Sequence, residues 1–171
     1  GNKIALVATA FAAVLPAYLY RTGAGFADHE AMAMMWMFAS LYLFAKAWNS
    51  EKLGRWLSLS IGSGILAGFM ALTWGGYRFL FAAIGMLIPL VLIFSKTEKE
   101  VMIRRLHSFF VWLVVGAVFL YIRYGSFGFI RAPEFMLASF AALAGIAYIC
   151  IHNYKDKIPE QITAAVPIGF L

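Results

Sequence analysis

The stretch WLSLSIGSGILAGFMALT, residues 56–73, decides the class of fold, because it contains no charged side chain. A membrane-spanning helix needs about 20 predominantly apolar residues, and this stretch is close to that length. Gly62, Gly64 and Gly68 place small side chains along it, and such a surface suits close packing between membrane helices. The stretch therefore predicts a transmembrane helix.

Similar apolar stretches lie on both sides of this one. They cover residues 4–20, 31–47, 79–94, 109–121 and 135–151, and another begins near residue 158. The chain of 171 residues is 63% hydrophobic and 13% charged, whereas a soluble domain carries roughly 25% charged residues. We therefore predict an all-α, polytopic transmembrane helix bundle with six to seven spans and short connections. Residues 1–171 are expected to be part of the transmembrane domain of a longer chain, without its carboxy-terminal soluble domain.

The basic residues divide unequally between alternate connections. Ten of the 14 lysines and arginines lie in one set of connections: Lys3, Lys46, Lys52, Arg55, Lys96, Lys99, Arg104, Arg105, Lys155 and Lys157. The other set holds Arg21, Arg78, Arg123 and Arg131. Because cytoplasmic loops carry the excess of lysine and arginine, the first set is predicted to face the cytoplasm and the second to face outward. The net charge of +6 therefore needs no nucleic-acid partner, and no soluble basic face is visible.

The stretch RTGAGFADHE, residues 21–30, gathers charge between two apolar spans, where unpaired charge is costly and usually functional. Asp28 and Glu30 can turn toward one ion if they lie where a loop enters a helix, and carboxylate oxygens suit divalent cations. Arg21 is a candidate counter-charge to a carboxylate or an anionic substrate. The alternative is that Asp28 and Glu30 cap a helix and complement its dipole.

Two further outward segments carry candidate residues. Trp74, Tyr77 and Arg78 flank a Gly-Gly pair whose backbone could hold a phosphate, although Trp and Tyr also belong to any membrane interface. Arg131 and Glu134 flank Ala132-Pro133, and this sequence equally fits the first turn of a helix.

Three ordered motifs resemble one family, the catalytic subunit of oligosaccharyltransferase, the enzyme of asparagine-linked glycosylation. They read PAYLYRTGAGFADHE at residues 16–30, WGGY at residues 74–77 and FGFIRAPEFM at residues 127–136. The resemblance implies a membrane glycosyltransferase that moves an oligosaccharide from a polyprenyl-(pyro)phosphate donor to an asparagine in an acceptor sequon. It also implies that the chain covers about the third span to the start of the ninth in a bundle of thirteen.

The resemblance assigns roles to the residues singled out above. Asp28 and Glu30 match a motif that binds Mn or Mg, with Arg21 beside them in the catalytic site. Trp74, Tyr77 and Arg78 are expected to bind the donor. The family's other acidic motifs and its acceptor-reading domain are missing, so this fragment alone is expected to be inactive. The expected partners are the polyprenyl-linked donor, the acceptor polypeptide, membrane lipid and other oligosaccharyltransferase subunits or a translocon.

The expected location is the prokaryotic cell membrane or the ER membrane, with the active site on the outer or lumenal face. Two alternatives remain at this stage. An ion-coupled transporter or channel would also use membrane carboxylates, and another glycosyltransferase acting on lipid-phosphate sugars would share the architecture.

Overall fold

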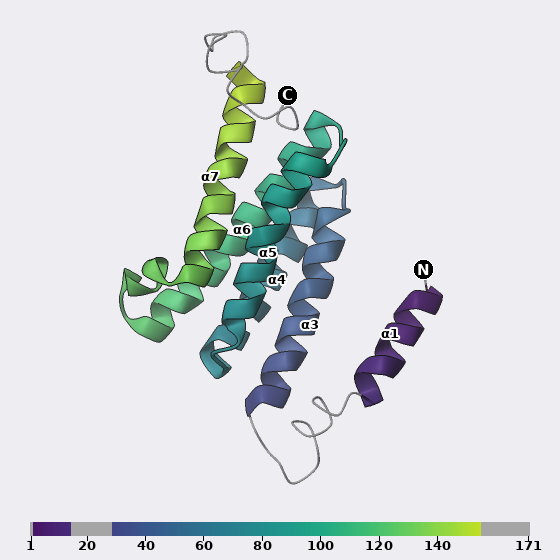
Figure 1. Cartoon of the computed structure of the whole chain (residues 1–171), viewed down its shortest axis with the longest axis vertical. Coiled ribbons are helices and arrows are strands. Elements are labelled where there is room, and N and C mark those ends of the chain that lie inside the picture. The colour runs from purple at the N-terminus through teal and green to yellow at the C-terminus, as the bar shows by residue number, and fades with distance from the viewer. Residues whose placement is uncertain (1, 15–28, 155–171) are drawn as a thin grey trace.

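The computed structural model describes residues 2–14 and 29–154, and these residues form helices without any strand. The α-helices are α1 (Asn2–Val14), α3 (His29–Trp48), α4 (Leu53–Thr73), α5 (Tyr77–Phe94), α6 (Lys99–Tyr124) and α7 (Pro133–Tyr154), and one 3-10 helix, η1 (Phe127–Arg131), precedes α7. The predicted all-α class is confirmed. The bundle formed by α3 to α7 is drawn in Figure 1, with α1 standing to one side of it.

Five of these helices are long and apolar enough to cross a membrane. They contain 18 to 26 residues, and at about 1.5 Å per residue they match a hydrocarbon core of about 30 Å. The span predicted at residues 109–121 was too short, because α6 begins at Lys99 and includes Arg104 and Arg105. Long basic side chains can sit near a helix end while their charged heads reach polar surroundings, so they do not end the helix. Residues 15–20 of the first predicted span, and the span predicted from residue 158, lie outside the described residues.

The helix ends separate into two groups (Figure 1). The start of α3, the α4–α5 connection and the segment between α6 and α7 lie at one end of the bundle, which we call the site end. The α3–α4 and α5–α6 connections lie at the other, which we call the basic end. The antiparallel order expected from short connections therefore brings two of the predicted outward segments, the α4–α5 connection and the segment between α6 and α7, to the same end as the start of α3.

Packing does not simply follow chain order. Helix α4 packs between α3 and α6, while α5 packs mainly on α7. A side-chain carbon added at Gly64 would lie 2.7 Å from Cβ of Val115, and one added at Gly68 would collide with the ring of Phe119. One added at Gly62 would lie 3.2 Å from Leu43. The small residues of α4 thus allow close approach on two sides, toward α6 and toward α3.

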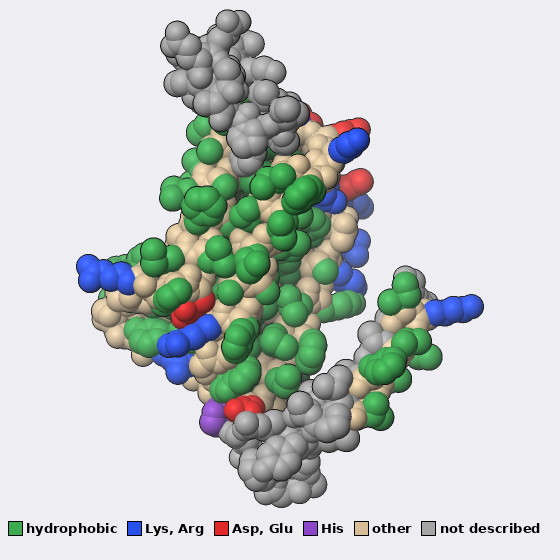
Figure 2. Space-filling view, viewed as in Figure 1, with side chains coloured by type: hydrophobic (Ala, Val, Ile, Leu, Met, Phe, Trp, Pro, Cys, Tyr) green, Lys and Arg blue, Asp and Glu red, His purple; other side chains and the backbone are tan. Residues whose placement is uncertain are grey.

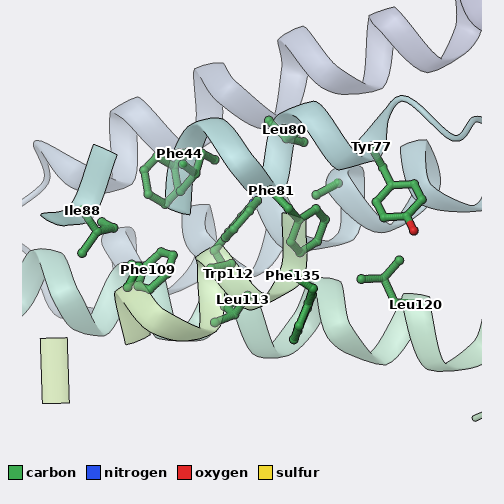
Figure 3. Packing of buried hydrophobic residues seen from close by; sticks show 14 of the residues in the cluster. Phe44, Tyr77, Leu80, Phe81, Ile88, Phe109, Trp112, Leu113, Leu120 and Phe135 are labelled. Carbon is green, nitrogen blue, oxygen red and sulfur yellow. The ribbon is translucent and has the colours of Figure 1, made fainter. Parts of the chain in front are cut away.

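Aromatic residues form the centre of the core (Figure 3). Trp112 and Phe81 are completely buried, and their ring centroids lie 4.8 Å apart. Phe44 contacts Trp112 from α3, and Phe135 contacts Phe81 from α7. Because these four residues come from four helices, their packing joins the α3–α4–α6 group to the α5–α7 pair.

Buried serines add hydrogen bonds between helices. The hydroxyls of Ser40 and Ser63 each donate to the other residue's carbonyl oxygen, at 2.8 Å and 2.7 Å, across the α3–α4 contact. The hydroxyls of Ser60 and Ser108 lie 2.6 Å apart between α4 and α6. These bonds pair hydroxyl groups across helix contacts in an apolar interior, where a polar group without a partner is costly.

The outer surface of the bundle is also apolar. Hydrophobic side chains cover much of the face shown in Figure 2, and Phe79 and Phe94 are 74% and 76% exposed. Large exposed apolar surfaces are unusual for a protein surrounded by water and suit contact with lipid or with further helices.

Candidate functional site

The site end contains a compact group of side chains around the α4–α5 connection. Helix α4 ends at Thr73 and α5 begins at Tyr77, so only residues 74–76 connect them. The indole of Trp74 lies so close to Gly76 that any side chain there would collide with it, whereas Gly75 has open space beside it. The paired glycines therefore have different tasks: Gly76 accommodates Trp74, and Gly75 leaves the backbone accessible.

Two tyrosines and an arginine fix this connection to α6. The hydroxyl groups of Tyr77 and Tyr124 lie 2.8 Å apart. The guanidinium of Arg123 donates a hydrogen bond to the carbonyl oxygen of Ala71, and it lies 5.7 Å and 5.6 Å from the ring centres of Tyr77 and Tyr124. Ala71 is in the last turn of α4, where carbonyl groups lack partners within the helix. Arg123 therefore both caps α4 and holds the aromatic rings in place.

A second arginine joins α5 to α7. Arg78 Nε lies 3.1 Å from Glu134 Oε1, and the two side chains are 59% and 12% exposed. The contact is an ion pair without hydrogen-bond geometry, because Glu134 Oε1 has no hydrogen bond to any described residue. We call Trp74, Tyr77, Arg78, Arg123, Tyr124 and Glu134 the site cluster.

The segment between α6 and α7 positions Glu134. Gly125 ends α6 with a φ of 63°, a left-handed conformation that glycine adopts readily. Phe129 of η1 then packs on Phe135 with ring centroids 5.0 Å apart. Pro133 is the first residue of α7 and Glu134 lies in its first turn, which agrees with the alternative interpretation of this sequence as the start of a helix.

An apolar groove of about 330 Å³ lies beside the site cluster, between α6, η1 and α7. Its lining includes Val118, Tyr121, Phe127, Phe129 and Phe135. Phe135 follows Glu134 in the chain, and Phe129 stacks on Tyr124. Charged and apolar surfaces therefore adjoin each other at this end of the bundle.

The structure places some of the predicted site residues together and leaves others apart. Asp28 and Arg21 lie outside the described residues. Glu30 is half-buried in the first turn of α3, at the same end of the bundle as the site cluster. Arg131 is exposed at the end of η1, and its side chain has no ion pair or hydrogen bond with a described residue.

Arg123 and Tyr124 were not predicted as site residues. The sequence suggested that Arg123 begins the outward loop, but α6 continues through Tyr124. One sequence feature could have indicated them: a Tyr and an Arg are adjacent at two helix ends, as Tyr77-Arg78 and as Arg123-Tyr124.

The described residues contain no group of three or more His, Cys, Asp or Glu side chains that could hold a metal ion. His107 and His152 each contact the carbonyl oxygen one turn earlier in their own helix. The predicted metal ligands Asp28 and Glu30 stand at the boundary of the described region, so this finding does not concern the pair.

An apolar five-span bundle with a charged and aromatic cluster at one end defines the class as polytopic α-helical membrane protein. Comparison with protein families then narrows the assignment. Residues 1–167 match the family described as oligosaccharyl transferase STT3, N-terminal, and the chain belongs to this family.

Similar proteins carry the same family name. The chain is 27% identical over 176 aligned residues to "Dolichyl-diphosphooligosaccharide--protein glycosyltransferase subunit STT3B" of Oryza sativa subsp. japonica, an alignment covering 97% of this chain and 23% of the relative. It is 26% identical to subunit STT3 of Saccharomyces cerevisiae, over 94% of this chain and 21% of that protein. The chain thus spans about a fifth of the length of the curated relatives it matches.

Proposed function

We propose that this chain forms part of the catalytic site of a membrane oligosaccharyltransferase. The proposed reaction transfers an oligosaccharide from a polyprenyl diphosphate to the side-chain amide of an acceptor asparagine. The observation that carries the proposal is the family match over residues 1–167. The name of the rice relative specifies a dolichyl-diphosphooligosaccharide as the substrate of that protein, and we extend the same class of donor to this chain.

We propose Asp28 and Glu30 as ligands of a catalytic Mn or Mg ion. Their chemistry fits, because both ions prefer hard oxygen ligands and are commonly held by one or two carboxylates plus substrate oxygens and water. When bound, such an ion would neutralise negative charge that develops on the leaving diphosphate. Glu30 lies in the first turn of α3, where the helix dipole also favours an anionic side chain. Arg21 is proposed as the counter-charge that orients these carboxylates.

The α4–α5 connection is proposed to bind the donor's diphosphate. The N–H groups of Gly75 and Gly76 donate no hydrogen bond to a described residue, and they precede the N-terminus of α5. Backbone N–H groups at a helix N-terminus bind phosphate well, and Gly75 leaves room for close approach. Arg78 keeps 59% of its side chain exposed despite its ion pair with Glu134, so its guanidinium can serve an anion as well. Arg131 supplies a further exposed cation at this end.

The apolar groove beside the site cluster is proposed to hold the donor's isoprenoid tail. Its lining contributes almost entirely apolar surface, and it adjoins the cations of the cluster. An amphipathic donor with an anionic head and an apolar tail fits this combination of surfaces. The proposed partners also include the acceptor peptide and other subunits or a translocon. The site end is proposed to face the cell exterior or the ER lumen.

The test is glycan transfer by the intact enzyme after changes to the proposed metal ligands. Asp28→Ala should abolish transfer while the protein still inserts into the membrane. Glu30→Asp should retain more activity than Glu30→Ala, because a carboxylate remains. The matched control is Glu98→Ala, which removes an exposed carboxylate at the basic end that makes no side-chain cap hydrogen bond, and it should leave transfer unchanged. Wild-type transfer by Asp28→Ala would overturn the metal-site proposal.

A further inference from the structure

A second cavity, with a charged lining, lies at the basic end, away from the site cluster. It is an open groove of about 570 Å³ where α3 ends and α4 begins. Three cations line it, Lys46, Lys52 and Arg55, together with the single carboxylate of Glu51. We call it the basic groove. Its charge excess favours an anion.

The cations of the basic groove are not used in internal bonds. Lys52 and Arg55 are exposed, and neither side chain makes an ion pair or hydrogen bond with a described residue. Lys46 lies over the ring of Tyr42 at 4.7 Å, a contact that leaves the ammonium available to an anion.

Basic residues of the neighbouring α5–α6 region behave differently. Lys99 Nζ donates to the carbonyl oxygen of His152 at 2.7 Å, and Arg105 Nη1 donates to Thr97 Oγ1 at 3.2 Å. The basic end therefore holds basic residues that brace the bundle as well as basic residues that line an open cavity.

The helix ends at the basic groove reinforce the attraction for an anion. Helix α4 begins at Leu53, its cap residue Lys52 provides no side-chain hydrogen bond, and no acidic residue lies in its first turn. The positive end of this helix dipole therefore meets no acidic side chain within the helix itself, and Glu51 just before it is the single carboxylate in the groove lining. At the end of α3, the amide of Asn49 donates to the carbonyl oxygen of Ala45 at 2.8 Å, which satisfies one of the groups that would repel an anion.

The surroundings favour an anion attached to an apolar body. Tyr42 lines the groove and is 58% exposed, and Leu53 beside it is 66% exposed. Basic pockets between membrane helices on the cytoplasmic side are known to bind the headgroups of acidic lipids. We propose that the basic groove binds a phosphate group, and that this phosphate belongs to the headgroup of an anionic membrane lipid whose tails lie along the exposed apolar ends of α3 and α4.

The experiment measures lipid retention by the intact, delipidated protein in detergent, using native mass spectrometry. The protein is offered an equal mixture of phosphatidylglycerol and phosphatidylcholine. We expect the wild type to retain phosphatidylglycerol in preference. Lys52→Gln should weaken that binding about fivefold, since each basic residue near an anionic lipid contributes about 1 kcal/mol. The triple variant Lys46→Gln, Lys52→Gln, Arg55→Gln should lose the preference.

The matched control is Lys96→Gln, which removes another exposed lysine of the basic end outside the groove. It should bind phosphatidylglycerol as the wild type does. If the triple variant fails to fold, the comparison of Lys52→Gln with Lys96→Gln still decides the question. Equal loss in these two single variants, or no preference for phosphatidylglycerol in the wild type, would overturn the proposal.

A second arm separates lipid from free phosphate. Inorganic phosphate is titrated into the detergent-solubilised protein by calorimetry and added as a competitor to the lipid assay. If millimolar phosphate does not bind the protein and does not displace phosphatidylglycerol, the result supports the lipid as the ligand. The opposite result would be phosphate binding that Lys52→Gln weakens, together with no preference of the wild type for phosphatidylglycerol. It would support binding of a phosphate group and overturn the proposal that a lipid supplies it.

Discussion

Removing Arg123 should loosen the α4–α5 connection that carries the proposed donor site. Its guanidinium donates to the carbonyl oxygen of Ala71, and the Ala71 residue is completely buried. In Arg123→Ala that carbonyl loses its partner, and the rings of Tyr77 and Tyr124 lose a cation 5.7 Å and 5.6 Å from their centres. A hydrogen bond to a charged group contributes about 1.5 kcal/mol at the low end of the usual range, and we take this value because Arg123 is exposed. The cation–π contacts add about 0.5 kcal/mol. The expected local destabilisation is therefore about 2 kcal/mol.

Hydrogen exchange followed by mass spectrometry measures this effect in the intact protein. A loss of about 2 kcal/mol corresponds to exchange about thirtyfold faster for amides opened by the local transition. The acceleration should appear in peptides covering residues 71–79 and be absent from the core of α4. Arg123→Lys keeps the charge but not the planar guanidinium, and it should show a smaller acceleration.

The control for this prediction is Arg131→Ala. Arg131 is also an exposed arginine at the site end, but its side chain has no hydrogen bond or ion pair with a described residue. Its removal should change stability by less than about 0.5 kcal/mol. The capping role of Arg123 would be refuted if amides in residues 71–79 exchange at the same rate in Arg123→Ala and in Arg131→Ala.

Three further predictions concern kinetics, packing and topology. If Arg78 binds the donor, Arg78→Ala should raise the apparent KM for the lipid-linked glycan or lower turnover. Either effect should be larger than in Glu134→Gln, which removes only the ion pair. Equal effects in the two variants would show that Arg78 acts only through its ion pair. Gly68→Val should destabilise the α4–α6 contact by about 1–3 kcal/mol through collision with Phe119, measured as a lowered unfolding midpoint, whereas Gly54→Ala has open space and should be tolerated. Topology can be tested with single cysteines in a Cys150→Ser background. A membrane-impermeant thiol reagent should label Arg131→Cys in intact cells or sealed, right-side-out vesicles, and it should label Lys96→Cys only after permeabilisation. The reverse pattern would invert the predicted topology.

The sequence was sufficient for the class of fold and for most helix positions. A run such as residues 56–73 predicts a span because hydrophobic length alone determines whether a helix can cross a bilayer. The start of α7 was also predictable, since Pro133 and Glu134 are local signals for a first helical turn. The start of α6 was not, because the segment from Lys99 to Arg105 carries four charged side chains among seven residues and is nevertheless helical.

The partners of each helix were decided only by the tertiary structure. Helices that are apolar on every side carry no stripe that marks the face turned toward a neighbour, so periodicity could not predict that α4 packs on α6 and α5 on α7. The site cluster depends on those pairings: Arg123 reaches Ala71 across 52 positions of the chain, and Tyr124 reaches Tyr77 across 47. The sequence by itself determined which segments span the membrane and which residue types lie at their ends. Close packing of small and aromatic side chains, such as Gly68 against Phe119, decided which of those ends meet.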